Sequence, residues 1–346
     1  MFRLIVNKSG YIFRGTLGML AVIAVIYFVA SATGLREDIV ASATAAEISP
    51  ENITFRPYEM IQPEITGHSE ITTIKTCNRA GSNIIITCDV AGVPVPARID
   101  TGLGFADICV STNLMTRLGL KFYPLNEIWT GITGGICYLE NIKIEGLQID
   151  TPRTAYIDQH RETQIWGMTI EQDYQLSIGL GILEKFSYVK FDNSVGQIEF
   201  GLKDQFEPSD GMWQKFPLRI GNDRYLQRRI FVDVPVDGVD CEMVFDTCGG
   251  DGLKVSKGLW ESIGLEGSNY SKNAGYVNST QFGTIGCDEI TVPIISIAGR
   301  DVKDAKVFVM PDDVRYFDNI LPMSVFSDTA VVIDFQSRLL WVDISN

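Results

Sequence analysis

The stretch Arg98-Ile99-Asp100-Thr101-Gly102 returns later in the chain, in altered form, as Val244-Phe245-Asp246-Thr247-Cys248. The flanking sequence repeats as well, because Val90-Ala91-Gly92-Val93 precedes the first Asp by the same spacing as Val236-Asp237-Gly238-Val239 precedes the second. Two copies of one turn, so far apart along the chain, indicate a duplicated domain and not a short solenoid repeat.

The composition is that of a globular protein. The 346 residues are 45% apolar, 10% aromatic and 21% charged, so the chain is long enough for two domains with cores of their own. The formal net charge is −14. This charge argues against nucleic acid or an anionic membrane surface as a partner, because both require a basic face on the protein. We interpret the acidity as a source of solubility.

Residues 1–34 have the pattern of an export signal. Arg3, Lys8 and Arg14 precede a charge-free apolar run that ends before Arg36. The run is about 20 residues long, which is enough for a single transmembrane helix acting as an anchor. Ala30-Ser31-Ala32 resembles the cleavage site of a signal peptide. Both interpretations place the rest of the chain on the periplasmic or extracellular side of a membrane.

The rest of the chain divides into a linker and two β-rich domains. Residues 35–72 mix Ala, Ser, Thr, Glu and Pro without steady periodicity, which predicts a linker or a propeptide, or else a segment that adds a strand to the folded part. Beyond it, many short β-branched segments and few helices predict a mostly β protein. The run from Phe206 to Gly211 predicts the boundary between a first domain, 73–206, and a second domain, 207–346.

Local signals predict individual elements. Gly92-Val93-Pro94 separates two β-branched segments, which predicts a hairpin leading into Asp100. Ser111 is predicted to cap a short helix that ends at Gly119. Further strands are predicted at 142–144, 154–157, 188–191, 197–200, 230–234, 290–292, 306–310, 330–334 and 339–342.

The cysteines and histidines give no metal or triad pattern. Seven cysteines is an odd number, and Cys77 and Cys88 flank a turn-like run, so a disulfide across a hairpin is one hypothesis and reduced core cysteines are the other. His68 and His160 lack the neighbours of a zinc site or of a nucleophilic triad. We therefore expect no metal and no cofactor, and a serine or cysteine nucleophile has little support.

Each half also contains a second apolar element, Ile178-Gly179-Leu180 in the first and Ile320-Leu321-Pro322 in the second. With these elements, the chain from about residue 75 to 346 resembles the aspartic peptidases, in a two-lobed pepsin-like arrangement of retropepsin-like domains. The resemblance implies a bilobal β-barrel acid-protease fold. It also implies a catalytic dyad of Asp100 and Asp246, supported by turn residues Thr101, Gly102, Thr247 and Cys248.

The resemblance implies an aspartic-type endopeptidase that hydrolyses peptide bonds through a water held between Asp100 and Asp246. Its partner would be a polypeptide substrate, and the N-terminal segment would attach it to a membrane if uncleaved. A monomer with an intramolecular pseudo-dimer is implied. The resemblance also implies a β-hairpin flap over the cleft, and the same run also reads as an ordinary Gly-rich turn. The candidate flap residues are Trp129, Gly131, Thr133, Gly134, Gly135 and Tyr138.

The second half departs from the family pattern. Cys248 and Pro322 stand where the family has glycine, and a side chain at Cys248 is expected to crowd the turn that presents Asp246. The alternative function is therefore a catalytically impaired pepsin-fold protein that binds peptides or proteins. A third interpretation, a dimer of separate chains, ranks last because one chain already contains both halves.

Overall fold

A computed structural model describes residues 63–67, 69–76, 83–129, 132–150, 152–158, 163–165, 168–170, 175–209, 211–223, 227–265, 270–279, 283–312, 314 and 318–345. Several residues discussed above lie outside this part of the chain: the predicted export segment at 1–34, His68, Cys77 and His160. The hypothesis of a Cys77–Cys88 disulfide is therefore not tested. Among the described residues, no helix combines the length and the apolar character that crossing a membrane requires.

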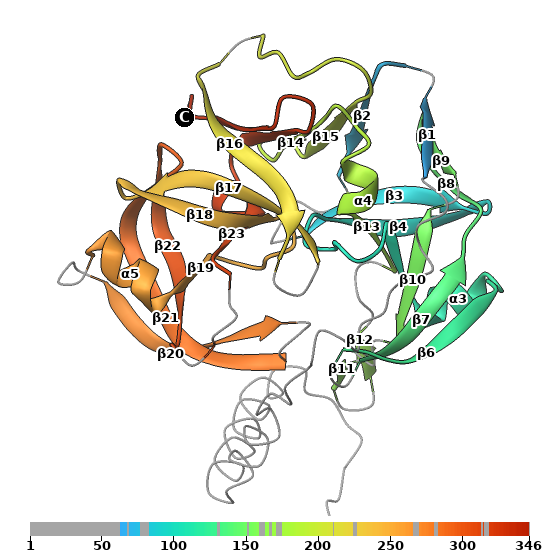
Figure 1. The fold of residues 1–346 in the computed structure, drawn as a ribbon, viewed down its shortest axis with the longest axis horizontal. Coiled ribbons are helices and arrows are strands. Elements are labelled where there is room, and N and C mark those ends of the chain that lie inside the picture. Colours follow the sequence, from blue (N-terminus) through green and yellow to red (C-terminus); the bar gives the residue numbers. More distant parts are fainter. Residues whose placement is uncertain are drawn as a thin grey trace, which may run out of the picture. The chain divides into compact units, whose positions relative to one another are not determined.

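The described part of the chain is mostly β, as predicted, and most of its strands lie in two sheets (Figure 1). The first sheet has the order β1 (Glu64–Gly67), β9 (Leu147–Asp150), β8 (Asn141–Ile144), β3 (Ile84–Val90), β4 (Val93–Asp100), β13 (Leu176–Gly179), β5 (Ile108–Ser111), β10 (Arg153–Asp158), β7 (Ile132–Tyr138) and β6 (Phe122–Trp129). A separate pair consists of β11 (Thr163–Ile165) and β12 (Met168–Ile170).

The second sheet has more strands than the first. Its order is β2 (Ile71–Lys75), β15 (Gln197–Gly201), β14 (Tyr188–Asp192), β24 (Ala330–Asp334), β25 (Leu339–Asp343), β16 (Trp213–Asn222), β17 (Arg228–Val236), β18 (Val239–Asp246), β23 (Ile320–Pro322), β19 (Leu253–Ser256), β22 (Arg300–Met310), β21 (Gly283–Ile297) and β20 (Ser271–Ser279). The helices are α3 (Thr112–Arg117), α4 (Leu180–Leu183), α5 (Lys257–Ile263) and the 3-10 helix η2 (Met323–Phe326).

The strand order β3-β4-β13-β5-β10-β7-β6 of the first sheet returns as β17-β18-β23-β19-β22-β21-β20 in the second. We call these series the first repeat and the second repeat. Each begins with a two-residue hairpin turn, Ala91-Gly92 or Asp237-Gly238, in which both residues have positive φ. Such turns match the twist of the paired strands, so the repeated sequence motif produces the same hairpin twice.

The helix cap is repeated too. The Ser111 hydroxyl accepts a hydrogen bond from the Leu114 amide at the start of α3, which confirms the predicted cap, and the Ser256 hydroxyl accepts one from Leu259 at the start of α5. Gly119 and Gly264 follow these helices with φ of 61° and 72°. The left-handed backbone that ends a helix suits glycine, so both helices begin and end by the same chemistry.

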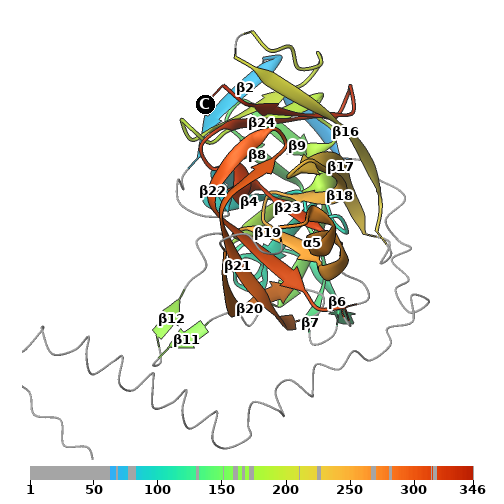
Figure 2. The same ribbon diagram turned by 90° about the vertical axis from the view of Figure 1, so that its left-hand side faces the viewer.

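The chain before the first repeat is part of the sheets. Within the segment predicted as linker or propeptide, β1 pairs with β9, and β2, which begins at Ile71, pairs with β15. These strands cover edges of β9 and β15 that would otherwise be unpaired. The segment therefore contributes strands to the folded part, which is one of the alternatives stated for it. Figure 2 shows β2, β24 and β16 at the same end of the second sheet.

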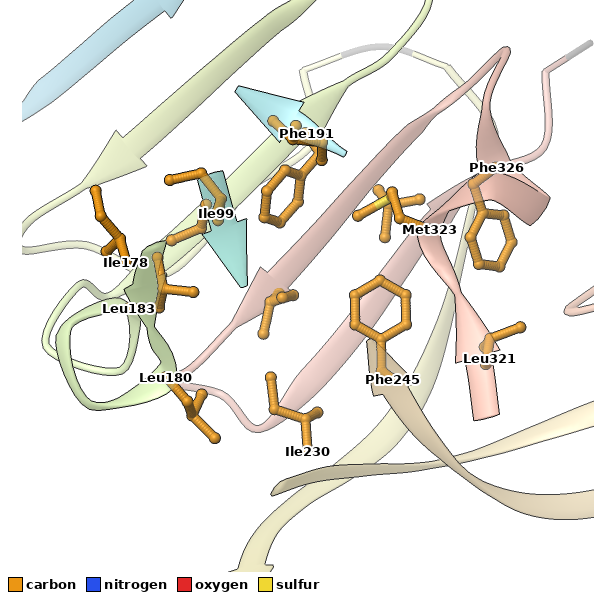
Figure 3. Close-up of a cluster of buried hydrophobic side chains, with 14 of the residues drawn as sticks. Ile99, Ile178, Leu180, Leu183, Phe191, Ile230, Phe245, Leu321, Met323 and Phe326 are labelled. Atoms are coloured by element: carbon orange, nitrogen blue, oxygen red, sulfur yellow. The ribbon is translucent and has the colours of Figure 1, made fainter. Parts of the chain in front are cut away.

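One apolar core runs through both repeats. Figure 3 shows side chains of this core gathered in one cluster, among them Ile99, Ile178, Leu180, Leu183, Phe191, Ile230, Phe245, Leu321, Met323 and Phe326. A smaller aromatic cluster lies after β15, where the Phe206 ring contacts Tyr188, Trp213 and Trp341 at 5.2–5.9 Å between centroids.

The core predicts that two isoleucines contribute differently to the free energy of unfolding. Ile333 on β24 is fully buried, whereas Ile294 on β21 is 56% exposed. We expect Ile333→Ala to lower the free energy of unfolding by about 2–5 kcal/mol, because it removes buried methyl groups and leaves a cavity. Ile294→Ala should change it by less than about 1 kcal/mol. Urea unfolding measures both values, and equal losses would contradict this description of the core.

Candidate functional site

Asp100 and Asp246 each end a strand beside a parallel partner. In the first repeat, β4 ends at Asp100, which lies in register with Gly179 of the parallel strand β13. In the second, β18 ends at Asp246, in register with Pro322 of β23. Strand ends that are fixed by parallel neighbours hold side chains more firmly than free loops do. The two aspartates therefore occupy equivalent places in the repeats.

The turns after these aspartates are joined by hydrogen bonds between Thr101 and Thr247 and their neighbours. The Thr101 amide donates to Thr247 Oγ1 at 3.0 Å, and the Thr247 amide donates to Thr101 Oγ1 at 2.9 Å. Each hydroxyl then donates across the junction, Thr101 to the Phe245 carbonyl at 3.1 Å and Thr247 to the Ile99 carbonyl at 2.8 Å. Both threonines are fully buried, so water cannot replace these bonds.

The Asp246 carboxyl lies against the first turn. A Cβ built on Gly102 would come within 2.7 Å of Asp246 Oδ2 and 2.9 Å of Oδ1. The carboxyl also contacts its own turn, where Oδ1 accepts a hydrogen bond from the Cys248 amide at 2.8 Å. Glycine at position 102 therefore makes room for the carboxyl of the other repeat.

The two carboxyls differ in their electrostatic environments. Burial raises the pKa of Asp246, and the negative charge of Asp100 raises it further, while the hydrogen bond from Cys248 acts in the opposite direction. Asp100 forms an ion pair in which Arg98 Nη2 lies 2.6 Å from its Oδ2. The site thus combines a carboxyl that favours its proton with one that has a cation in direct contact.

The Cys248 side chain fits its turn. Its thiol donates a hydrogen bond to the Ile99 carbonyl at 3.0 Å, and the turn closes with the Gly249 amide bonded to the Asp246 carbonyl at 3.2 Å. Burial raises the pKa of this thiol well above its ordinary value, so it stays a neutral donor. The side chain at position 248 therefore has a backbone acceptor within reach.

Pro322 fits because the glycine of the packing contact lies at a different position in each repeat. In the first repeat, Gly179 is the small partner, because a Cβ there would lie 2.7 Å from the Leu103 carbonyl oxygen. In the second repeat, Pro322 replaces that glycine, and Gly249 replaces Leu103. A Cβ on Gly249 would lie 3.0 Å from the Pro322 Cβ. The close packing beneath each Asp turn is kept, with the glycine on the opposite side of the contact.

Two cations bind turn carbonyls. Arg229 on β17 donates to the Gly102 carbonyl of the other repeat, and its Nε lies 3.2 Å from Asp223 Oδ2. Lys254 on β19 donates to the Gly249 carbonyl, and burial lowers the pKa of its ammonium group. Sequence analysis missed both residues, because neither has a fixed spacing from the Asp turns. Arg98 had a signal, since it is a charged residue two positions before Asp100 on an apolar strand.

The candidate flap residues lie in or beside the hairpin of β6 and β7. Residues 130 and 131 and the side chains of Trp129 and Thr133 lie outside the described part. Gly134 and Gly135 are buried within β7 and pair with β10 as well as β6. These two glycines therefore lie in the paired part of the hairpin and not at its tip. Tyr138 is exposed at the other end of β7, with its ring edge-on to Tyr123 at 5.8 Å.

No group of His, Cys, Asp and Glu residues with metal-binding geometry occurs within the described part of the chain. No known family model and no curated protein matches the sequence. Among solved structures, the chain is similar to a retropepsin-like aspartic protease from Rickettsia conorii, with 16% sequence identity and a TM-score of 0.27, over 40% of this chain and 91% of that chain. A likeness of this size assigns no family.

The threonine junction can be tested with isosteric substitutions. Thr101→Val and Thr247→Val should each lower the free energy of unfolding by about 1–3 kcal/mol, because each leaves buried amide and carbonyl groups unpaired. The double variant should lose less than the sum, since the two residues share the same bonds. Thr116→Val on the exposed face of α3 is the control and should change stability by less than about 0.5 kcal/mol. Additive losses in urea unfolding would contradict the junction.

The space at Gly102 gives a second test. Gly102→Ala should lower the free energy of unfolding by about 1–3 kcal/mol, because the added methyl group displaces the Asp246 carboxyl. Gly258→Ala in α5 is the matched control, since nothing lies within 4 Å of a Cβ there, and alanine in a helix should stabilise by about 0.5–1 kcal/mol. If both variants are equally stable in urea unfolding, the Asp246 carboxyl does not lie against Gly102.

Proposed function

We propose that this chain is an aspartic-type endopeptidase with Asp100 and Asp246 as its catalytic dyad. The observation that carries the proposal is the junction of the two Asp turns, in which Thr101 and Thr247 exchange hydrogen bonds. The contact of the Asp246 carboxyl with Gly102 brings the second carboxyl to the first turn. An equivalent residue from each repeat thus contributes to one site.

In this proposal the two carboxyls share one proton, because the negative charge of Asp100 opposes ionisation of Asp246. The ionised carboxyl takes a proton from a water molecule as the water oxygen bonds to the peptide carbonyl carbon, and the protonated carboxyl gives its proton to the carbonyl oxygen. The carbon–nitrogen bond then breaks as the first carboxyl passes its proton to the nitrogen. The second carboxyl recovers a proton from the intermediate hydroxyl, so the dyad returns to its starting state.

The repeated strand order supports a duplicated acid-protease fold of two lobes, with an intramolecular pseudo-dimer in place of a dimer of chains. The proposed substrate is a polypeptide in extended conformation. The residues before Arg36 support export, with the catalytic part facing the periplasm or the exterior as a membrane-anchored or a secreted protein.

The alternative function, a pepsin-fold binding protein without turnover, rests on Cys248 and Pro322. The Cys248 thiol has an acceptor in the Ile99 carbonyl, and Gly249 makes room for Pro322. Both residues therefore fit the geometry that the dyad requires. These two contacts favour the peptidase over the binding protein.

The proposal predicts that either aspartate is indispensable. Asp100→Asn and Asp246→Asn should each lower kcat/KM for an unstructured protein by about 10³-fold or more, because an amide can neither accept nor return the shared proton. Asp233→Asn, on an exposed position of β17, is the matched control and should retain full activity. The measurement is the rate of new amino termini over acidic to neutral pH. Cleavage that survives both dyad substitutions would remove the dyad from the mechanism.

A further inference from the structure

Arg98 is placed by its strand against the catalytic site. It lies two residues before Asp100 on β4, so both side chains project from the same face of the strand. Its Nη2 is 2.6 Å from Asp100 Oδ2, and the two side chains are 20% and 10% exposed. A short ion pair with so little access to water is stronger than a surface pair, because solvent screens it less.

The second repeat has no counterpart of this cation. Val244, a buried apolar residue, occupies the position of Arg98. None of the ion pairs between described residues involves Asp246, whose Oδ1 accepts from the Cys248 amide. The duplicated site is therefore asymmetric in charge: one carboxyl touches a guanidinium and the other touches backbone.

The structure assigns to Arg98 the role of a positioning residue that decides which carboxyl of the dyad carries the proton. Arg98 holds Asp100 as the ionised carboxylate that accepts a proton from water, and Asp246 keeps the proton that is given to the peptide carbonyl. This inference rests on the proposed peptidase function and adds to it a division of labour that the symmetric turns do not provide.

Neighbouring thiols do not disturb this assignment. Cys109 on β5 lies near Arg98 and Asp100, and burial raises the pKa of its thiol to about 12. The pKa of the Cys248 thiol in the second turn is raised well above its ordinary value for the same reason. Both thiols are neutral at physiological pH, so they add no negative charge beside Asp100.

The other cations near the dyad are bound elsewhere. The charge of Arg229 on β17 lowers the pKa of Asp246, and its guanidinium donates to the Gly102 carbonyl and pairs with Asp223. Lys254 on β19 donates to the Gly249 carbonyl. Of the described cations near the dyad, Arg98 is the one in an ion pair with a catalytic carboxyl.

The assignment determines how activity depends on pH. Activity should fall on the alkaline side as pH rises through the raised pKa of Asp246, because the proton donor is then lost. Activity should fall on the acid side as the pair takes up its second proton and the base is lost. Arg98 opposes that second proton by its charge, so it extends activity toward lower pH.

The test compares pH profiles of kcat/KM for the wild-type chain, Arg98→Met and Arg98→Lys. Methionine keeps the apolar part of the side chain without its charge, and lysine keeps the charge. We expect Arg98→Met to move the acid limb upward by about one pH unit, a tenfold change in proton concentration. The alkaline limb should move less, and Arg98→Lys should restore most of the wild-type profile. A residue that only supports the fold would lower the whole profile without moving its acid limb.

Two results would overturn the inference. One is an unchanged acid limb in Arg98→Met, and the other is higher activity at every pH, which would make Arg98 an inhibitory contact. A 13C NMR titration of the aspartate carboxyls, assigned with Asp100→Asn and Asp246→Asn, measures the protonation of the pair directly and does not require turnover. The lower macroscopic step of the pair should rise by about one pH unit in Arg98→Met. If the wild-type chain cleaves nothing, the proposed function fails, while this titration still decides the role of Arg98.

Discussion

The reciprocal hydrogen bonds of Thr101 and Thr247 are the constraint on which the site depends. Each hydroxyl accepts from the opposite amide and donates to the carbonyl before the opposite Asp. The bonds are buried, so each lost partner would leave a polar group without water. Because the carbonyls belong to Ile99 and Phe245, directly before the two aspartates, one network fixes the direction in which both carboxyls leave their strands.

Around this symmetric junction the repeats have diverged in compensated ways. The small residue of the packing contact lies at Gly179 in one repeat and at Gly249 in the other, so each repeat keeps a glycine in this contact although Pro322 replaces one. The charge beside the aspartate differs between the repeats. Arg98 contacts Asp100, whereas the equivalent residue in the second repeat, Val244, has no charge. Duplication therefore preserved the shape of the site and allowed its electrostatics to become unequal.

The sequence predicted the structural features that depend on residues close together along the chain. The Ala91-Gly92 hairpin and the Ser111 cap follow from residues a few positions apart. The repeated Asp-Thr motif indicated the residues of the candidate site. Contacts between distant segments left no such signal. Arg229 binds the Gly102 carbonyl of the other repeat, and β2 joins β15 across most of the first repeat. The paired position of Gly134 in β7 also depends on a strand, β10, that lies outside its local sequence.

The most direct measurement of the central claim is a crystal structure of the chain with a peptide in which a hydroxymethylene group replaces the scissile amide. A tetrahedral carbon with a hydroxyl mimics the intermediate that the dyad would form and bind tightly. We expect the hydroxyl oxygen to lie within about 3.2 Å of a carboxyl oxygen of both Asp100 and Asp246. A peptide bound with its hydroxyl away from either carboxyl, or carboxyls that point into separate spaces, would contradict the account.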